Sequence, residues 1–377
     1  MTATTQQDAA HSGVRTITAL VKSDNQPGLH NVDVVVLPEP VPGPDEVLVE
    51  LIYAGLCHTD TAMVDQDAAA RGGYRPNFPL ILGHEFVGRV VELGTDVAAL
   101  VSAGKAATGL QAGQRVVGGS HVTCRTCSRC RAGRSMLCEN LKVLGLDIDG
   151  ICASRFVVPA VNIVPVPESV TDKAAALAEP FAVAVHAVER ANLDRFHSES
   201  RPRVAVVGPG TVGLLVLCAL SGYEVTMIGT AADAGQLELA RKLGATECLA
   251  LEPGQTVNHP FDAVIEAAGH HSAVATAIDV CADGGTVVCV GLPARPTPVD
   301  TADLARREVN LVGSRAYDLS TWRQMGQRLV DAPQLERLVT HSLGFDGFGQ
   351  AIELLRNREA IKVVLNPSPA TQGNNNR

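Results

Sequence analysis

One short segment, residues 204–221, restricts the possible folds of this chain more than any other. Its apolar run Val204–Val207 has the composition of a buried strand, and a glycine-rich turn leads from it into an apolar run expected to be helical over 212–221. A GxGxxG turn in this setting lets the backbone approach a pyrophosphate, to which the helix N-terminus presents unpaired N–H groups. The simpler alternative is a turn that uses glycine only for backbone freedom. The context favours a dinucleotide site formed by Gly208, Gly210, Thr211, Val212 and Gly213.

Strand-like and helical segments alternate around this turn. Strands are expected over 224–228, 262–265 and 286–290, and a helix over 236–243. Such alternation implies a parallel, doubly wound sheet, which we place within residues 179–331. Ligands of these sheets bind at the carboxyl ends of the strands. Ala268 and Val290, at the ends of two strands, are therefore expected to bind the cofactor near its nicotinamide.

The N-terminal half of the chain has a different sequence pattern. Short β-branched runs separated by Pro- and Gly-rich turns predict mostly β structure over 15–178. After about Asp331 the alternation stops again, and the polar ends, 1–12 and 368–377, are expected to be flexible tails. The predicted fold class is therefore α/β plus β, in a chain of 377 residues that is long enough for more than one domain.

The charge and cysteine content exclude several classes of function. A net charge of −9 argues against a nucleic-acid partner or an anionic membrane surface, since both need clustered Lys and Arg. Residues 204–223 carry no charge, but their glycine-rich turn would break a membrane-spanning helix early. The first twelve residues lack the apolar core of a secretory signal, and ten cysteines are too sparse for a secreted disulfide scaffold. A cytoplasmic protein is expected.

The choice between NAD and NADP stays open. An NAD site usually has Asp or Glu about 20 residues after the first glycine of the turn, where this chain has Gly229 followed by Thr230. No Arg or Lys lies between Gly229 and Gln236 to attract a 2′-phosphate. Asp233 is a candidate to reach the ribose from the loop, which gives NAD a slight preference. Gly229 and Thr230 are expected to contact the cofactor.

Four cysteines, at positions 124, 127, 130 and 138, fall within a short lobe that we place at about 118–140. Cys124-x2-Cys127-x2-Cys130-x7-Cys138 can surround one tetrahedral ion, and a closed four-cysteine zinc site is structural. A ferredoxin-type iron–sulfur run would space its fourth cysteine at three and follow it with proline, whereas Glu139 follows here. A redox CxxC would need a strand–helix setting, which is missing.

A second candidate metal site comes from two separate motifs, Cys57-His58-Thr59-Asp60 and Gly83-His84-Glu85. The Cys57 thiolate, the His84 imidazole and a carboxylate would hold Zn²⁺ and leave a fourth position open, as catalysis requires. A single cysteine or histidine is more often simply packed, and the pairing of two such motifs favours the metal site.

These motifs together resemble the zinc-containing alcohol dehydrogenases of the medium-chain dehydrogenase/reductase superfamily. Gly83-His84-Glu85-x2-Gly88-x5-Gly94-x2-Val97 matches the zinc signature of that family, and the resemblance extends in order over about residues 15–366. It implies a GroES-like catalytic domain over 15–178, a Rossmann domain over 179–331 and a return segment of the catalytic domain over 332–367. It also implies two zinc ions per chain and a homodimer or homotetramer.

The segment Ala178-Glu179-Pro180 resembles the polyol, threonine and sugar dehydrogenase branch of the family. The third ligand of the catalytic zinc is then either Glu85 or Glu179. Ala62 stands where some relatives carry a relay histidine, so Thr59 is expected to take the substrate proton, with His58 as a further group on the path or at the cofactor phosphates. Asp60 is expected to orient His84. Arg315 and Tyr317 loosely resemble an Arg–Tyr pair near the polyol pocket.

The implied activity is reversible hydride transfer between a small secondary alcohol (a polyol, sugar or amino-alcohol) and NAD or NADP, with zinc as the Lewis acid. Two alternatives are a zinc-free quinone or enone reductase of the same superfamily and a non-catalytic NAD(P)-binding sensor or scaffold.

Overall fold

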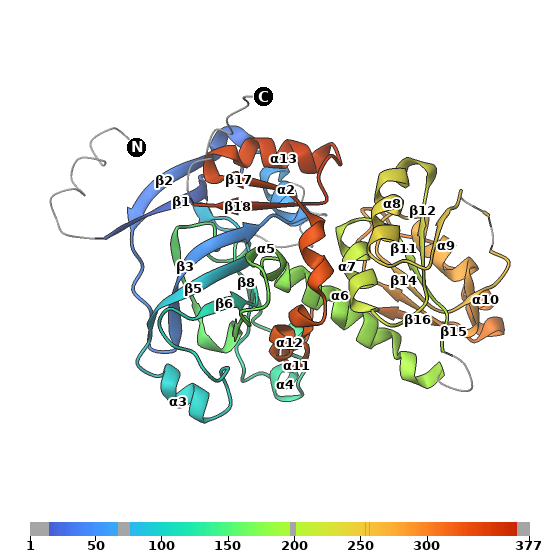
Figure 1. The fold of residues 1–377 in the computed structure, drawn as a ribbon, viewed down its shortest axis with the longest axis horizontal. Helices are drawn as coiled ribbons and strands as arrows, with labels where there is room; N and C mark the ends of the chain where they lie inside the picture. Colours follow the sequence, from blue (N-terminus) through green and yellow to red (C-terminus); the bar gives the residue numbers. More distant parts are fainter. Residues whose placement is uncertain (1–14, 67–75, 197–200, 253, 256, 368–377) are drawn as a thin grey trace. The chain divides into compact units, whose positions relative to one another are not determined.

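The computed structural model describes residues 15–66, 76–196, 201–252, 254–255 and 257–367, so both expected tails, 1–12 and 368–377, lie outside the described residues. The chain divides into two compact units (Figure 1). Unit 1 contains the residues up to Glu179 and those from Trp322 onward, and unit 2 is Pro180–Thr321. Across the described part of the chain, no helix has both the length and the apolarity that a membrane span requires.

Unit 1 is built mainly from β-strands. A three-stranded sheet has the order β2 (Val32–Pro38), β1 (Thr16–Lys22), β4 (Leu80–Ile81). A seven-stranded sheet has the order β10-β6-β5-β3-β18-β17, with β9 pairing on β3. Its strands are β3 (Glu46–Gly55), β5 (Glu85–Leu93), β6 (Arg115–Gly118), β9 (Arg155–Pro159), β10 (Ile163–Pro165), β17 (Val339–Gly344) and β18 (Lys362–Asn366). The mostly β first half of the chain was expected from its β-branched runs.

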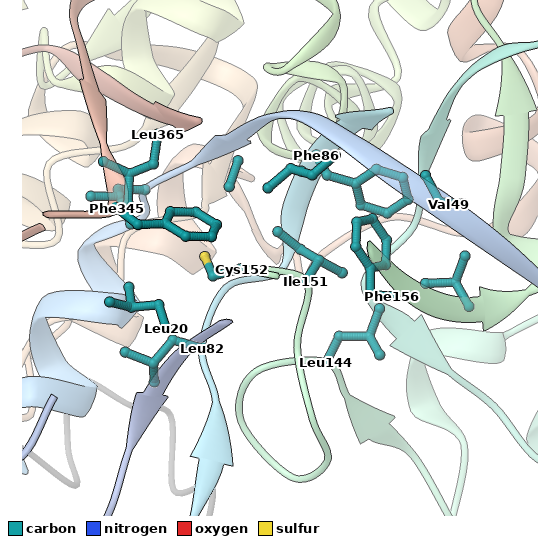
Figure 2. Packing of buried hydrophobic residues seen from close by; sticks show 14 of the residues in the cluster. Leu20, Val49, Leu82, Phe86, Leu144, Ile151, Cys152, Phe156, Phe345 and Leu365 are labelled. Carbon is teal, nitrogen blue, oxygen red and sulfur yellow. The ribbon is translucent and has the colours of Figure 1, made fainter. Parts of the chain in front are cut away.

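One apolar core joins the two parts of unit 1. The rings of Phe86 and Phe156 meet edge to face with centroids 4.8 Å apart, an arrangement that aromatic pairs prefer. Figure 2 shows Phe345 and Leu365, which come from the C-terminal part, in the same buried cluster. The C-terminal segment therefore completes the hydrophobic core of the N-terminal domain and does not form one of its own.

The return to unit 1 begins at Trp322, earlier than the expected start at 332. Trp322 is almost completely buried, and its indole N–H donates to the carbonyl of Asn162 over 2.8 Å. Helix α12 (Met325–Val330) follows, with Gly326 against the carbonyl of Pro165. The alternating pattern is lost only after about Asp331, whereas the chain passes from unit 2 to unit 1 at Trp322.

Unit 2 is a six-stranded, all-parallel sheet of order β13-β12-β11-β14-β15-β16. The strands are β11 (Val204–Val207), β12 (Val225–Gly229), β13 (Glu247–Ala250), β14 (Phe261–Glu266), β15 (Cys281–Cys289) and β16 (Asn310–Gly313). The helices between them include α7 (Thr211–Ala219), α8 (Ala234–Lys242), α9 (Ala273–Asp279) and α10 (Thr301–Arg307). The predicted fold class, α/β plus β with a doubly wound parallel sheet, is confirmed.

Candidate metal centres and cofactor-binding turn

Cys57, His84 and Glu85 lie together because two strands of unit 1 pair in a fixed register. Strands β3 and β5 are antiparallel, and Gly55 at the end of one faces Glu85 at the start of the other. The residues just beyond each strand therefore meet, and one ligand atom from each of the three side chains lies within 4.8 Å of the others. Thiolate, imidazole and carboxylate are a donor set that zinc takes in catalytic sites.

Cys57 is held at the N-cap of helix α2 (His58–Asp65). Its backbone N–H donates to Oδ2 of Asp60 over 2.8 Å, and the N–H of Asp60 donates back to the carbonyl of Cys57. The hydroxyl of Thr59 lies 3.5 Å from Sγ of Cys57. A capping interaction thus fixes the thiol, and the first turn of α2 places Thr59 beside it. His58 is exposed on the same turn.

Asp60 faces His84 inside this centre. Oδ1 of Asp60 lies 3.8 Å from Nδ1 of His84, and within the described residues neither atom has a hydrogen-bond partner. Burial raises the pKa of the Asp60 carboxyl. Burial alone would lower the pKa of His84, but the charge of Asp60 and the contact with Cys57 raise it well above its ordinary value. These two buried polar atoms without partners lie beside the Cys57 thiol and fit a site that a bound cation completes. Asp60 faces the histidine ring at a distance longer than a hydrogen bond.

Glu85 is fully buried and paired with Lys362 of β18. Nζ of Lys362 donates to Oε1 of Glu85 over 2.7 Å, and it lies 2.5 Å from Oε2. Burial opposes the charge of Lys362, yet the Glu85 carboxylate raises its pKa overall. A Cβ on Gly55 would sit only 2.2 Å from Oε2 of Glu85, so the carboxylate needs glycine there. Sequence reasoning missed Lys362, although a lysine between Ile361 and the apolar residues of β18 is itself unusual.

Glu179 lies at the start of helix α6 (Ala178–Ala191) and is 7% exposed. Its Oε1 accepts a 2.7 Å hydrogen bond from the hydroxyl of Ser120, which also lies 2.9 Å from Nδ1 of His121. Its charge helps to raise the pKa of His84. Of the two candidate carboxylates, Glu85 belongs to the three-residue cluster with Cys57 and His84, and Glu179 stands close enough to act on the histidine charge.

The four cysteines of the lobe converge as their spacing suggested: Cys124, Cys127, Cys130 and Cys138 form one group whose sulfur atoms all lie within 4.8 Å of one another. Backbone N–H groups point at the sulfurs, with Cys127 donating to Cys124, and Cys130 to Cys127. The N–H groups of Thr126 and Cys127 lower the pKa of the Cys124 thiol to about 5, whereas burial raises that of Cys130 to about 12. The four sulfurs form a closed donor set for one metal ion.

The glycine-rich turn joins β11 to α7 in unit 2. Gly208 has a φ of 101°, and a Cβ there would lie 2.6 Å from Cα of Ala268. A Cβ on Gly213 would lie 1.9 Å from the carbonyl oxygen of Gly208. Gly210 is the N-cap of α7, and a Cβ at this position would meet no atom within 4 Å. The turn thus has the geometry predicted for it, with Thr211 and Val212 in the first turn of the helix.

The end of β12 places Gly229 and Thr230 beside this turn. A Cβ on Gly229 would lie 3.0 Å from Cγ of Pro209 and 3.2 Å from Cβ of Asp233. Oδ2 of Asp233 accepts from both the backbone N–H and the hydroxyl of Thr230, over 2.9 and 2.8 Å. A carboxylate therefore stands at the strand end although the usual position holds glycine.

Ala268 and Val290 follow the ends of β14 and β15, and hydrogen bonds attach both turns to Glu266. The last two candidates, Arg315 and Tyr317, follow β16 in unit 2. Tyr317 is buried and Arg315 is exposed, so their side chains lie in different surroundings.

Comparison with known proteins decides the family. Residues 43–168 match the family described as alcohol dehydrogenase GroES-like domain, and residues 172–366 match the one described as glucose dehydrogenase C-terminus. The chain belongs to the zinc-containing alcohol dehydrogenase family. This dehydrogenase is 30% identical over 359 residues to the L-threonine 3-dehydrogenase of Xanthomonas campestris pv. campestris (strain B100), covering 92% of this chain and 98% of that protein. The corresponding enzyme of Shewanella woodyi is 29% identical over 361 residues, with 92% and 99% covered.

Solved structures agree in fold. An alcohol dehydrogenase from Pyrobaculum aerophilum aligns with a TM-score of 0.78 at 28% identity, covering 94% of this dehydrogenase and 100% of that chain. Galactitol-1-phosphate dehydrogenase from Escherichia coli gives 0.77 at 25%, covering 93% and 100%. A protein described as a zinc-binding dehydrogenase, from Sinorhizobium meliloti and solved bound to NADP, gives 0.80 at 27%, covering 94% and 100%. The predicted oxidoreduction of alcohols is confirmed as the reaction class, and the zinc-free reductase alternative is not favoured.

Proposed function

We propose that this dehydrogenase catalyses reversible oxidation of a secondary hydroxyl in a small polyol, sugar or amino-alcohol, using zinc and NAD(P). The observation that carries the proposal is the convergence of Cys57, His84 and Glu85 in one buried cluster with Thr59 beside the thiol. The relatives act on substrates of this kind, since threonine has a secondary hydroxyl next to its amino group and galactitol-1-phosphate is a polyol derivative.

Cys57, His84 and Glu85 would hold the catalytic zinc, and Glu179 is the carboxylate available from helix α6 as the alternative third ligand. The metal, when bound, supplies Lewis acidity that favours the ionised form of the hydroxyl. Thr59 is proposed to take the hydroxyl proton at Oγ1 while its own proton passes on, through the cofactor ribose hydroxyl to water or towards His58, so that Thr59 stays neutral. Asp60 holds the Cys57 backbone through a hydrogen bond and is proposed to orient the His84 ring, which it faces over 3.8 Å, and Lys362 balances the charge of Glu85.

The cofactor is proposed to bind on unit 2 through Gly208, Gly210, Thr211, Val212, Gly213, Gly229, Thr230, Ala268 and Val290. Its nicotinamide supplies the hydride chemistry. We favour NAD over NADP because the Asp233 carboxylate stands at the end of β12, where it would accept from a ribose hydroxyl and repel a 2′-phosphate. The four-cysteine lobe is proposed to hold a second, structural zinc.

The proposal is tested by a screen of polyols, sugar alcohols and amino-alcohols with each cofactor, followed by nicotinamide absorbance, together with zinc analysis. We expect turnover with at least one alcohol and about two zinc ions per chain. Metal-free protein that still reduces a quinone or enone would overturn the zinc assignment, and a metallated sample inactive with every alcohol would overturn the activity.

The third ligand is tested separately. Glu85→Gln is expected to weaken zinc binding by about tenfold or more, and Glu179→Gln to have a smaller effect, when zinc affinity is measured by competition with a chelating dye. The reverse order would assign the ligand to Glu179.

Two further expectations complete the proposal. Light scattering is expected to give a homodimer or homotetramer. A reducing compartment such as the cytoplasm suits thiolate ligands and the ten free cysteines of the described chain.

A further inference from the structure

Glu266 is a buried carboxylate that the proposed reaction does not use. It is the last residue of β14 and has no exposed surface. Its Oε1 accepts hydrogen bonds from the backbone N–H groups of Ala268 and Gly269, over 2.8 and 2.9 Å. Its Oε2 has no hydrogen-bond partner among the residues that the structure describes. A buried charge with only one oxygen satisfied is costly, so the position calls for an explanation beyond packing.

The main chain of Glu266 attaches a second turn. Its carbonyl accepts from the N–H groups of Val290 and Gly291, over 2.9 and 3.2 Å. Ala267, next in the chain, donates to the carbonyl of Val207 at the end of β11 over 2.8 Å. The side chain and backbone of one residue therefore hold the ends of β14 and β15, beside the strand that leads into the glycine-rich turn.

The three strand-end turns pack without room for a side-chain carbon between them. A Cβ on Gly208 would lie 2.6 Å from Cα of Ala268. A Cβ on Gly291 would lie 2.3 Å from the backbone nitrogen of Gly269 and 2.8 Å from Oε2 of Glu266. Since the backbones are in direct contact, a displacement of the 267–269 turn must move the phosphate-binding turn or the 290–291 turn.

We propose that Glu266 is a positioning residue for the dinucleotide: its carboxylate holds the 267–269 turn in the conformation that lets all three strand ends contact the cofactor together. The inference rests on the proposed function, because it assumes that the cofactor binds at these strand ends. It adds a residue that acts on the cofactor through the backbone, without touching the alcohol or the metal.

The test is the affinity for NADH, measured by nicotinamide fluorescence, and for ADP-ribose, measured by competition. Glu266→Leu removes the acceptor for two N–H groups and is expected to raise the Kd of NADH by about tenfold or more. Glu266→Gln keeps an acceptor oxygen and is expected to stay within about threefold of the parent protein. The matched control is Thr286→Val on β15, a buried hydroxyl in the same sheet whose Oγ1 also has no partner in the described chain.

A merely structural role predicts a different result. It predicts lower thermal stability with an unchanged Kd for NADH in the variant that remains folded, and that outcome overturns the inference. A positioning role predicts a higher KM for the cofactor, with the zinc content and the KM for the alcohol unchanged. An equal loss of NADH affinity in Thr286→Val would also overturn it.

A second variant covers the case in which Glu266→Leu does not fold. Gly291→Ala keeps the carboxylate but forces the 290–291 turn away from Gly269, and it is expected to weaken NADH binding as well. Its control is Gly313→Ala on β16, where a Cβ meets nothing within 4 Å. NADH affinity unchanged in Gly291→Ala would overturn the inference. A parent protein that binds neither NADH nor NADPH would overturn the proposed function itself, which separates the two failures.

Discussion

Nζ of Lys362 lies 2.7 Å from Oε1 of Glu85, and the two residues are separated by 277 positions in the sequence. Both side chains are almost completely excluded from solvent, with relative exposures of 3% and 0%. A buried ion pair adds little net stability, because the desolvation of both charges offsets their attraction. The removal of one partner is costly, however, since it leaves the other as an unpaired buried charge.

Lys362→Met is therefore expected to destabilise the protein by about 3 kcal/mol or more, because the Glu85 carboxylate loses its counter-charge. The free energy of unfolding in urea measures the effect. The control is Lys242→Met, since Lys242 is largely exposed in its pair with Glu238 and the change should cost less than about 1 kcal/mol. Equal stabilities for the two variants would contradict the prediction.

Cys57→Ala and His84→Ala are expected to lower kcat by about a thousandfold or more, because each removes a ligand of the proposed catalytic zinc. NADH affinity should survive, since the proposed cofactor residues lie in the other unit. Steady-state rates and fluorescence titration measure the two effects. Cys248→Ala, a half-buried thiol on β13, is the control and should stay fully active. Unchanged turnover in either ligand variant rules out the mechanism.

Cys124→Ser is expected to destabilise unit 1 without a change in the proposed chemistry, because a structural zinc contributes folding free energy. A loss of about 2 kcal/mol would lower Tm by about 5 °C, which calorimetry resolves. Removal of the metal with a chelator should also lower the Tm of the parent protein, and it should not destabilise the four-cysteine lobe of the variant any further. A variant that melts like the parent would remove the structural-site assignment.

Asp233→Asn is expected to shift the ratio of kcat/KM for NAD and NADP by about tenfold toward NADP, since it removes the negative charge and keeps an acceptor for Thr230. The control is Glu238→Gln on α8, an exposed carboxylate paired with Arg241. The same shift in both variants would indicate a general charge effect and contradict a specific role of Asp233.

Glu266 also predicts a pH dependence of stability. Burial raises its pKa above the ordinary value of 4.5, although the backbone N–H groups of Gly269 and Ala268 act in the opposite direction. A carboxyl whose pKa is raised by folding favours the folded state below its unfolded pKa, and that contribution is lost as pH rises through the folded pKa. Glu266→Gln should therefore be at least as stable as the parent at pH 8, and its advantage should shrink toward pH 4. An advantage that grows on acidification would contradict this assignment.

The sequence was sufficient for those parts of the molecule that local patterns determine. The Cys124 lobe, the Gly208 turn and the Cys57 and His84 motifs each contain their donors within a few residues, so spacing alone indicated the chemistry. Lys362 was missed, and the hydrogen bonds of Glu266 could not be read from local patterns, because these contacts are made by β18 and by the turns after β14. The alternation of strands and helices in unit 2 could be predicted from the sequence. Strands β13 and β16 could not, because β13 has no fully buried position and β16 is largely exposed, so neither has the apolar run by which a strand is recognised.

Strand β18 lies between β3 and β17, so a strand from the C-terminal part of the described chain belongs inside the sheet of unit 1. Unit 2, by contrast, is one uninterrupted stretch of chain. During synthesis unit 2 can therefore fold before unit 1 is complete. Until β18 has been made, the edge of β3 that pairs with it stays open. Glu85 gains its counter-ion Lys362 only when β18 joins the sheet. A chain truncated before β18 would therefore have both an exposed sheet edge and an uncompensated buried charge.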